Sequence, residues 1–333
     1  MTGDSAASPF SLGAEGATDG SFQRQESRFC DWVSADGSTA FPAEAGRYHL
    51  YVSWACPWAH RTVIGRRLKG LGDAIGLSVV DPIRDERGWA FTGGEYVDHA
   101  NGFRFLSEAY AASDPEYEGR FSVPVLWDTE SGRIVSNESG DILRMLDSGF
   151  GALADGGVDL RPEAQREEID ALNAHVYDTV NNAVYKAGFS TSQAVYEQEV
   201  RGLFATLDEL DARLAPRRFL FGGTPVETDW RLFTTLVRFD AVYAIHFKCS
   251  LRRVVDYANL WPYLRDLYQQ PGIAETVRLE EIRAHYYRTH PMINPSGLVA
   301  LAPDEDFDAP HGRERLGAQA AAARQPAQGS SAA

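Results

Sequence analysis

The chain has 333 residues, of which 44% are hydrophobic, and its formal net charge is -15. This length and apolar content predict about two globular domains with substantial cores. The negative charge argues against a nucleic-acid partner and against docking on anionic lipid, since both require clustered Lys and Arg. No apolar run approaches the roughly 18 residues of a transmembrane helix, so we expect no membrane partner.

The cysteines and the chain ends indicate the setting. Cys30, Cys56 and Cys249 are too few for a disulfide framework, which favours a reducing cytoplasm. The N-terminus has no basic region followed by an apolar one, so it does not have the form of a secretory signal. Small and polar residues dominate 1–22 and the tail from Gly317, and we expect both segments to be disordered.

Strand-like and helical patterns alternate from about residue 46 to 150. Strands are predicted from the β-rich runs RYHLYVSW, LSVVDPI, SVPVLWD and GRIVSN, the last two joined as a hairpin by DTESG. Helices are predicted from PWAHRTVIGRRLKGLG, which has apolar residues at helical spacing and ends at glycines, and from ESGDILRMLDSGF. The order predicts an α/β domain over 23–150. Its insert, residues 84–120, is too long for an ordinary loop.

The strand patterns disappear after about residue 162. Amphipathic or apolar helices are predicted from PEAQREEIDALNAHVYDTVNNAVYKAGF, SQAVYEQEVRGLFATLDELDARLA, DWRLFTTLVRFDAVYAIHF and YANLWPYLRDLYQQ. The Gly-rich stretch SGFGALADGGVDL separates the two patterns. We therefore expect an all-helical domain over 151–300, then a C-terminal segment and disordered tail over 301–333, of which the first part packs back on the protein.

Cys56 stands between a predicted strand and Pro57, a favoured first residue of a helix. At this position unpaired backbone N–H groups and the helix dipole stabilise an anion. We therefore expect a lowered thiol pKa and a thiolate nucleophile; the alternative is a small buried hydrophobic residue. Because no second cysteine stands at Trp58 or Ala59, a resolving thiol comes either from a soluble thiol or from Cys30.

Two further motifs resemble parts of a binding site. In a thioredoxin-like fold, a proline that opens the third strand is commonly cis and exposes the backbone before it to a peptide-like ligand; Val123–Pro124 fits this role, with an edge strand as the alternative. Glu138 and Ser139 open a helix, where Ser139 can cap the N–H groups and a ligand carboxylate can dock. Glu138 can accept from a ligand ammonium. With Cys56, these motifs suit a γ-glutamyl tripeptide thiol.

These residues, in this order of strands and helices, resemble the glutathione transferase fold, an α/β thioredoxin-like N-terminal domain followed by an all-α C-terminal domain. More specifically, the chain resembles the xi class, the glutathionyl-hydroquinone reductases. The matching stretches extend from about residue 27 to about 315: SWACPWAHRT, VPVLWD, SNESGDILRML, NNAVYKAGF, DWRLFTTLVRFDAVY, HFKC and HYYRTHPMINPSGLV.

The resemblance implies a mechanism in which glutathione is a co-substrate. The Cys56 thiolate attacks the sulfur of a glutathionyl-hydroquinone, the hydroquinone leaves, and a second glutathione resolves the mixed disulfide to oxidised glutathione. The resemblance also implies a homodimer.

Further site residues follow from the resemblance alone. Trp89 would cover the bound tripeptide, and Arg120 would donate to one of its carboxylates. Tyr185 and Tyr286, with Tyr287 as an adjacent alternative, would contact the quinol oxygens. Taken without the resemblance, these side chains are ordinary packing or surface residues.

Two other functions remain open at this point. An omega-like cysteine-type transferase with thioltransferase or dehydroascorbate reductase activity would use the same Cys56 and Glu138–Ser139, whereas a non-catalytic binding module would not need to keep them. No metal is expected, because His246 and Cys249 lack a second pair of ligands. At the helix near Asp229, the cap position holds Val226, and Thr228 is the expected substitute.

Overall fold

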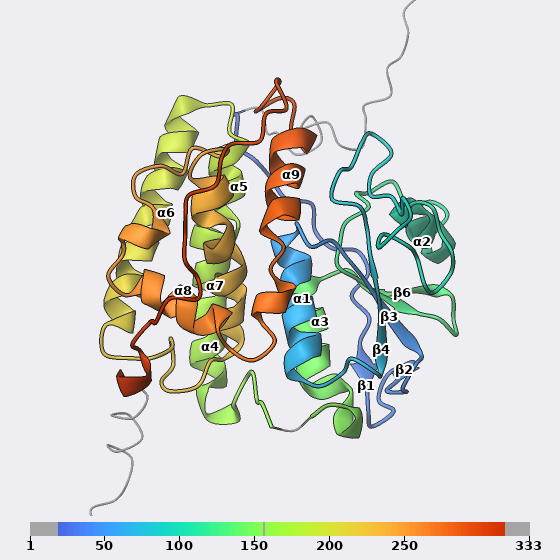
Figure 1. Ribbon diagram of the computed structural model, residues 1–333. Coiled ribbons are helices and arrows are strands. Elements are labelled where there is room, and N and C mark those ends of the chain that lie inside the picture. The colour runs from blue at the N-terminus through green and yellow to red at the C-terminus, as the bar shows by residue number, and fades with distance from the viewer. Residues whose placement is uncertain (1–18, 156, 317–333) are drawn as a thin grey trace, which may run out of the picture.

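The computed structural model describes residues 19–155 and 157–316, and the predicted disorder of 1–18 and 317–333 lies outside these residues (Figure 1). A 4-stranded sheet has the order β4-β3-β5-β6. β3 is parallel to β4, whereas β5 is antiparallel to both of its neighbours. These four strands are β3 (Tyr48–Val52), β4 (Ile75–Val79), β5 (Val125–Asp128) and β6 (Arg133–Ser136). The predicted strands and the hairpin are confirmed, although β4 begins before the predicted stretch.

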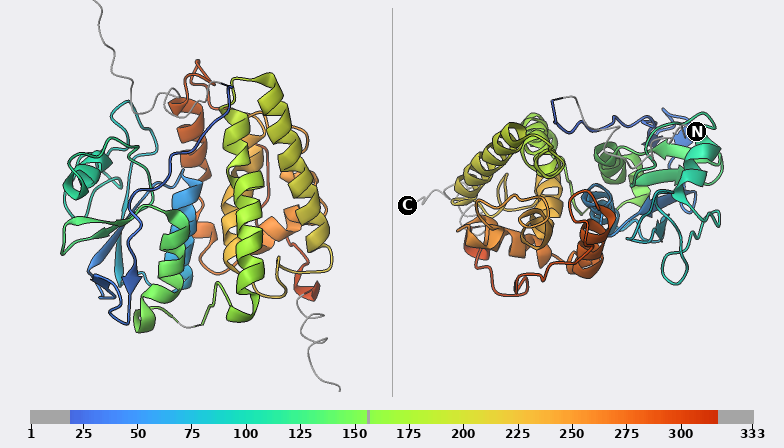
Figure 2. Two further views of the ribbon diagram at one scale, coloured as in Figure 1. Left: turned by 180° about the vertical axis from the view of Figure 1, so that it is seen from behind. Right: turned by 90° about the horizontal axis from the view of Figure 1, so that it is seen from above.

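Helices cover both faces of this sheet. α1 (Pro57–Leu68) and α3 (Ser139–Arg144) lie on the face turned toward the helical half, and α2 (Leu106–Ser113) lies on the other face (Figures 1 and 2). α1 was predicted from its apolar spacing, and α3 lies within the second stretch that was predicted to be helical. α2 belongs to the insert 84–120 and was not predicted, and neither were the two-residue strands β1 (Val33–Ser34) and β2 (Phe41–Pro42), which are too short to show a period.

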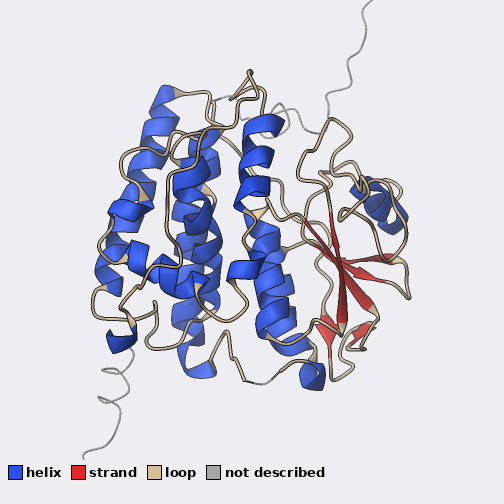
Figure 3. Cartoon of the chain, in the orientation of Figure 1, coloured by secondary structure: helices blue, strands red, loops and turns tan. Residues whose placement is uncertain are grey.

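The second half of the described chain is helical, and no strand follows β6 there (Figure 3). Its helices are α4 (Arg166–Val176), α5 (Ala183–Gly188), α6 (Gln193–Leu214), α7 (Glu227–Arg238), α8 (Leu260–Tyr268) and α9 (Leu279–Thr289). α7 is buried along almost its whole length and packs on α1. The two halves together have the α/β plus all-α architecture that the patterns predicted. No helix in the described part of the chain has the length and apolar content needed to cross a membrane.

The start of α7 corrects one expectation. Val226 itself is the cap residue, and the Thr228 hydroxyl is buried without a hydrogen-bond partner among the described residues. The Asp229 carboxylate accepts from the backbone N–H groups of Val226 (2.8 Å) and Leu220 (3.0 Å). The start of α7 is therefore fixed by a carboxylate that reaches back to the N–H of the cap residue, and not by the Thr228 hydroxyl.

The predicted disorder of 1–22 is wrong for its last residues. The Thr191 N–H donates to the Gly20 carbonyl at 3.1 Å. The Phe22 ring is buried and lies 5.4 Å from the Phe189 ring between centroids. A single aromatic residue in a polar stretch is enough to anchor this segment, and composition alone does not reveal such an anchor.

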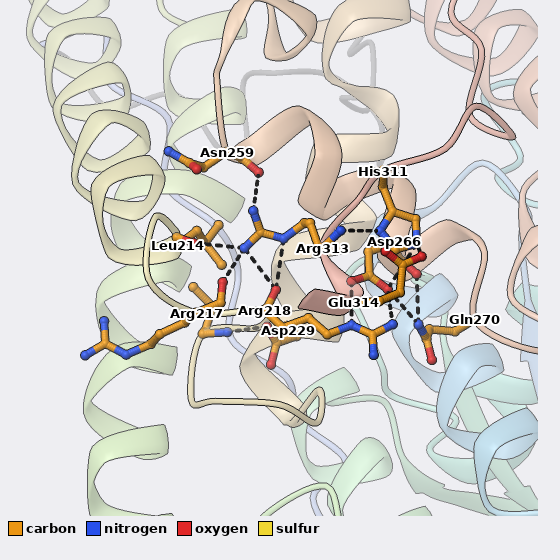
Figure 4. Close-up of polar contacts among 11 residues, drawn as sticks. Leu214, Arg217, Arg218, Asp229, Asn259, Asp266, Gln270, His311, Arg313 and Glu314 are labelled. Carbon is orange, nitrogen blue, oxygen red and sulfur yellow. Dashed lines mark hydrogen bonds and ion pairs between the residues drawn. The ribbon is translucent and has the colours of Figure 1, made fainter. Parts of the chain in front are cut away.

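The C-terminal segment packs back on the helical half, and Arg313 anchors it (Figure 4). The buried guanidinium donates from Nη2 to the Leu214 carbonyl at 2.9 Å and from Nε to the Arg218 carbonyl at 3.1 Å. It also donates to the carbonyls of Arg217 and Asn259. Leu214 is the last residue of α6, and Arg217 and Arg218 follow that helix, so Arg313 supplies donors near a helix end, where carbonyls lack intrahelical partners.

Arg313→Ala should lower the free energy of unfolding by about 3 kcal/mol, because several buried carbonyls lose their donor. Urea unfolding followed by circular dichroism measures the change. Arg315→Ala, at an exposed position two residues further along, is the matched control and should change stability by less than ~0.5 kcal/mol. Equal stability of the two variants would contradict the anchoring role.

Candidate active site

Cys56 occupies the N-terminal cap of α1. Its backbone is extended (φ -79°, ψ 119°), and Pro57 is the first helical residue. The Cys56 Sγ donates to the Val123 carbonyl at 3.5 Å. The predicted placement of this cysteine, between a strand and a helix N-terminus, is confirmed.

Burial raises the pKa of the Cys56 thiol above its ordinary value. The backbone N–H groups of Ala59 and Trp58 and the guanidinium groups of Arg238 and Arg24 act in the opposite direction, but burial is the larger effect. The prediction of a lowered pKa is therefore wrong. The helix terminus and the two cations offset part of the cost of burying a thiolate.

Arg238, at the end of α7, holds the loop that precedes the cysteine. Its Nη2 donates to the Trp54 carbonyl at 2.9 Å and its Nε to the Ala55 carbonyl at 3.1 Å. Nη1 donates to the Thr234 carbonyl at 2.8 Å and lies 3.0 Å from His60 Nδ1. One fully buried side chain of the helical half therefore sets the position of the loop from which Cys56 projects.

His60 continues this network away from the cavity. Burial lowers the pKa of His60 well below its ordinary value, so the ring is neutral. Nδ1 then accepts from Arg238, and Nε2–H donates to Thr276 Oγ1 at 2.8 Å. The Thr276 hydroxyl donates in turn to the Ile273 carbonyl at 2.6 Å. His60 is thus a structural residue that orients Arg238 and takes no part in the cavity.

The Val123–Pro124 peptide bond is cis, as predicted. Pro124 precedes the first residue of β5. Val123 and Pro124 both line the cavity beside Cys56. The carbonyl of Val123 already accepts from the thiol, so the backbone here faces the cavity and not a neighbouring strand.

Glu138 and Ser139 lie at the start of α3, but their roles differ from those expected. Glu138 is the cap residue, and its Oε1 accepts from the Gly140 N–H at 3.1 Å. Its Oε2 accepts from the Ser27 hydroxyl at 2.9 Å. Ser139 is the first helical residue and is not the cap. Both residues line the cavity, so they remain available to a ligand.

A cavity of about 400 Å³ opens over Cys56, between the two halves of the protein. Nine of the ten predicted site residues line it: Cys56, Trp89, Arg120, Val123, Pro124, Glu138, Ser139, Tyr185 and Tyr286. The tenth, Tyr287, does not. Its hydroxyl donates to the Ala241 carbonyl at 3.3 Å, because neighbouring residues on α9 point in different directions.

Three tyrosine hydroxyls form a chain at one wall of the cavity. The Tyr185 and Tyr286 hydroxyl oxygens are 2.5 Å apart, and the Tyr286 and Tyr243 oxygens are 3.0 Å apart. Burial raises the pKa of all three, so they are neutral hydroxyls. Tyr243 was not predicted; it lies in a π-helical turn, Phe239–Tyr243, where sequence spacing does not indicate direction.

Trp89 and Arg120 lie in the insert and reach the cavity from the thioredoxin-like half. The Trp89 ring stacks on His285 of α9 at 5.0 Å between centroids, with 18° between the planes. Nδ1 of His285 lies 2.6 Å from the Pro82 carbonyl. Arg120 donates its backbone N–H to Gln25 Oε1 at 3.0 Å. The insert therefore contributes to the site and touches both the N-terminal segment and α9.

The N-terminal segment supplies cavity residues that sequence reasoning missed. Phe22, Arg24, Gln25, Glu26 and Ser27 all line the cavity. The segment precedes the first predicted strand in the sequence and has no periodic pattern. Its few aromatic and basic residues are the only signal that could have distinguished it from a disordered segment.

Neither Cys30 nor the histidines complete a metal site in the part of the chain described. No group of three or more His, Cys, Asp or Glu side chains there has an arrangement that could hold a metal ion. His246 Nε2 is 3.1 Å from His290 Nδ1, and Cys249 is buried in the helical core. Cys30 is exposed and lies at the edge of the same cavity as Cys56.

Comparison with known proteins assigns the fold to a family. Residues 55–148 match the family "Glutathione S-transferase, N-terminal domain", and residues 193–266 match "Glutathione S-transferase, C-terminal domain". The chain is 50% identical to the glutathionyl-hydroquinone reductase YqjG of Escherichia coli, over 90% of this chain and 94% of that protein. It is 46% identical to the glutathionyl-hydroquinone reductase PcpF of Sphingobium chlorophenolicum, over 85% and 90%.

Solved structures agree with these matches. A xi class glutathione transferase from Natrialba magadii superposes with a TM-score of 0.87 and 51% identity, covering 91% of this chain and 94% of that one. A glutathione-bound structure of the Escherichia coli YqjG has a TM-score of 0.83 and 50% identity, covering 86% and 96%.

The chain belongs to the glutathione transferase family. Within that family its relatives are xi class proteins and glutathionyl-hydroquinone reductases, and the resemblance predicted from the motifs is confirmed.

Arg238→Met should slow the alkylation of Cys56 by iodoacetamide near neutral pH by about tenfold, because a cation that lowers the thiol pKa is lost and the loop loses its donors. Mass spectrometry in a Cys30→Ser background measures the rate. Arg231→Met is the matched control on the same helix, since that guanidinium binds Glu227 and not the loop. Equal rates in both variants would contradict the role given to Arg238.

Proposed function

We propose that this protein is a glutathione-dependent reductase that removes glutathione from glutathionyl-hydroquinones. The observation that carries the proposal is one cavity that holds both the Cys56 thiol and the hydroxyl chain of Tyr185 and Tyr286. A thiol at a helix N-terminus serves any disulfide exchange. The aromatic wall with hydroxyl donors suits a flat phenolic ring in addition.

In the first step Cys56 attacks the glutathionyl sulfur. A Cys56–glutathione disulfide bond forms, the carbon–sulfur bond to the ring breaks, and the two sulfur atoms are oxidised while the ring carbon is reduced. The thiol loses one proton and the ring carbon gains one, so the step has no net proton demand. Arg238 and the N–H groups at the start of α1 stabilise the thiolate during the attack.

In the second step a glutathione molecule attacks the mixed disulfide. Oxidised glutathione leaves and the Cys56 thiol is restored, with the electron pair passing to its sulfur. Cys30 is the alternative resolving thiol, since it lies at the edge of the same cavity. We assign the step to glutathione, because the Cys30 thiol donates to the Ser27 carbonyl and burial raises its pKa.

The tripeptide subsite lies on the thioredoxin-like side of the cavity. We assign to it the backbone at Val123 and Pro124, the start of α3 with Glu138 and Ser139, and the side chains Trp89 and Arg120. All of them line the cavity on that side, and the start of α3 offers backbone N–H groups to a carboxylate. Glutathione bound to the related Escherichia coli protein supports this ligand.

The quinol subsite lies on the helical side. The linked hydroxyls of Tyr185 and Tyr286 would donate one hydrogen bond to a ring oxygen, and Tyr243 would support them through the chain. This wall favours the hydroquinone reductase over an omega-like thioltransferase, which needs no hydroxyl chain for an alkyl disulfide. The intact Cys56 and Glu138 argue against a non-catalytic module.

We further propose a cellular location, an oligomeric state, a physiological role and a division into domains. The three free cysteines support a cytoplasmic location, and the family supports a homodimer. The chemistry supports a role in removing quinone adducts. The end of the sheet at Ser136 supports a division into a domain over 23–150 and a helical domain over 151–300.

Cys56→Ser should abolish the release of hydroquinone from a glutathionyl-hydroquinone in excess glutathione, because oxygen at this position cannot form the mixed disulfide. Chromatography measures free hydroquinone. Cys30→Ser is the parallel variant and should retain turnover if glutathione is the resolving thiol. Turnover by the Cys56→Ser protein would sink the proposed function.

Tyr185→Phe and Tyr286→Phe should each lower kcat by about tenfold to a hundredfold with less effect on glutathione affinity, because each breaks the hydroxyl chain that donates to the ring oxygen. Steady-state kinetics and glutathione titration separate the two effects. Tyr287→Phe is the matched control, since its hydroxyl points away from the cavity. A loss of glutathione affinity alone would place these tyrosines in the tripeptide subsite instead.

A further inference from the structure

Arg24 lies across the helical wall of the cavity, although it comes from the N-terminal segment. Its Cζ is 4.6 Å from the centroid of the Trp58 ring and 4.9 Å from that of Tyr185. Its Nε donates to Asn182 Oδ1 at 3.0 Å. Two aromatic faces and one amide acceptor therefore fix a guanidinium between α1, which begins beside Cys56, and α5, which carries Tyr185.

The remaining donors of this guanidinium are not all used. Arg24 Nη2 is buried and has no hydrogen-bond partner among the residues that the structure describes. Leaving a buried donor without an acceptor costs roughly 1–3 kcal/mol, more for a charged group. Since Arg24 lines the cavity, an acceptor can come from a bound molecule, and the positive charge favours a negatively charged oxygen.

The tyrosine chain alone is poorly suited to bind a negatively charged oxygen. Its three hydroxyls carry three protons, and the two hydrogen bonds between Tyr185, Tyr286 and Tyr243 use two of them. One proton is left to donate to a substrate oxygen. Neutral donors of this kind stabilise a full negative charge less well than a cation does in a cavity with little water.

Negative charge must appear on the substrate in the proposed reaction. When the ring carbon that bears sulfur has taken up its proton, the adjacent ring oxygen is a carbonyl. Attack of Cys56 on sulfur then sends the electron pair of the carbon–sulfur bond through the ring to that oxygen. The ring leaves as a phenolate, which is protonated to give the hydroquinone.

We propose that Arg24 is a further catalytic residue, which binds the hydroquinone oxygen that becomes a phenolate as the carbon–sulfur bond breaks. This inference rests on the proposed function. Asn182 is a positioning residue, since its amide oxygen orients the guanidinium across the rings of Trp58 and Tyr185.

Arg24 also lowers the pKa of the Cys56 thiol. An experiment therefore has to separate this effect on the thiol from the proposed binding of the ring oxygen. The separation compares two reactions in which the Cys56 thiolate attacks sulfur. Glutathionyl-hydroquinones release a ring whose oxygen takes the charge, whereas bis(2-hydroxyethyl) disulfide releases a thiolate with no ring. A loss through Cys56 lowers both rates together, but a loss at the ring oxygen lowers the first rate only.

The test measures single-turnover hydroquinone release by the full-length protein from glutathionyl-hydroquinones whose ring substituents vary the acidity of the hydroxyl. Arg24→Gln should lower the rate by about 100-fold relative to its rate with bis(2-hydroxyethyl) disulfide. The rate should also depend more steeply on hydroxyl acidity, because the charge is no longer neutralised. Arg24→Lys should recover part of the rate, and Asn182→Ala should show a smaller change in the same direction.

Arg84→Gln is the matched control. It removes a guanidinium from the Trp89 end of the cavity, where Arg84 Cζ lies 5.4 Å from the Trp89 ring. The rate of hydroquinone release by the Arg84→Gln protein should depend on hydroxyl acidity as steeply as the rate of the unaltered protein does.

The outcomes separate this inference from the proposed function. Arg24→Gln could lower the rates of both reactions by the same factor, or it could keep the acidity dependence of the unaltered protein. Either result would show that Arg24 does not bind the ring oxygen. The inference would then be overturned, while the proposed reductase function would stand. If the unaltered protein releases no hydroquinone, the proposed function and this inference both fall.

Discussion

The site depends on one buried guanidinium. Arg238 belongs to the helical half, yet it donates to the Trp54 and Ala55 carbonyls of the loop in the thioredoxin-like half and is itself held by His60. A buried cation is costly unless it is hydrogen-bonded, and here backbone carbonyls and a neutral imidazole accept from all three nitrogens of the guanidinium. The loop can adopt this position only when α7 is packed on α1. The geometry of the thiol is therefore a property of the interface between the halves and not of either half alone.

That interface explains why the cavity has two chemically different walls. The thioredoxin-like side presents backbone groups and the start of α3, which suit a peptide with carboxylates. The helical side presents aromatic rings, the linked hydroxyls of Tyr185 and Tyr286, and the Arg24 cation, which suit a phenolic ring. Cys56 lies where the walls meet, so under the proposed function a conjugate that joins a tripeptide to a ring through sulfur would span the cavity with its sulfur at the thiol. The same burial that shapes the cavity raises the thiol pKa, and Arg238, Arg24 and the helix N-terminus counter that effect.

Much of this arrangement was predictable from sequence. The strand-to-helix position of Cys56, the cis peptide at Val123–Pro124 and the hairpin follow from local rules, because each depends on a few adjacent residues. The features that were missed depend on distant ones. Tyr243 faces Tyr286 through a π-helical turn, Tyr287 points away although it is adjacent to Tyr286, and Arg24 reaches Tyr185 from a segment without periodicity. The pKa of Cys56 was predicted in the wrong direction because a motif indicates the helix N-terminus and says nothing of how deeply the tertiary structure buries the sulfur.

The most direct test of the account is a single turnover without added glutathione. The protein is mixed with one equivalent of a glutathionyl-hydroquinone and analysed by intact mass and peptide mapping while free hydroquinone is measured. The account predicts one equivalent of hydroquinone and one glutathionyl group on Cys56, with no ring attached. Hydroquinone released without glutathione on Cys56, or an adduct that retains the ring, would contradict it.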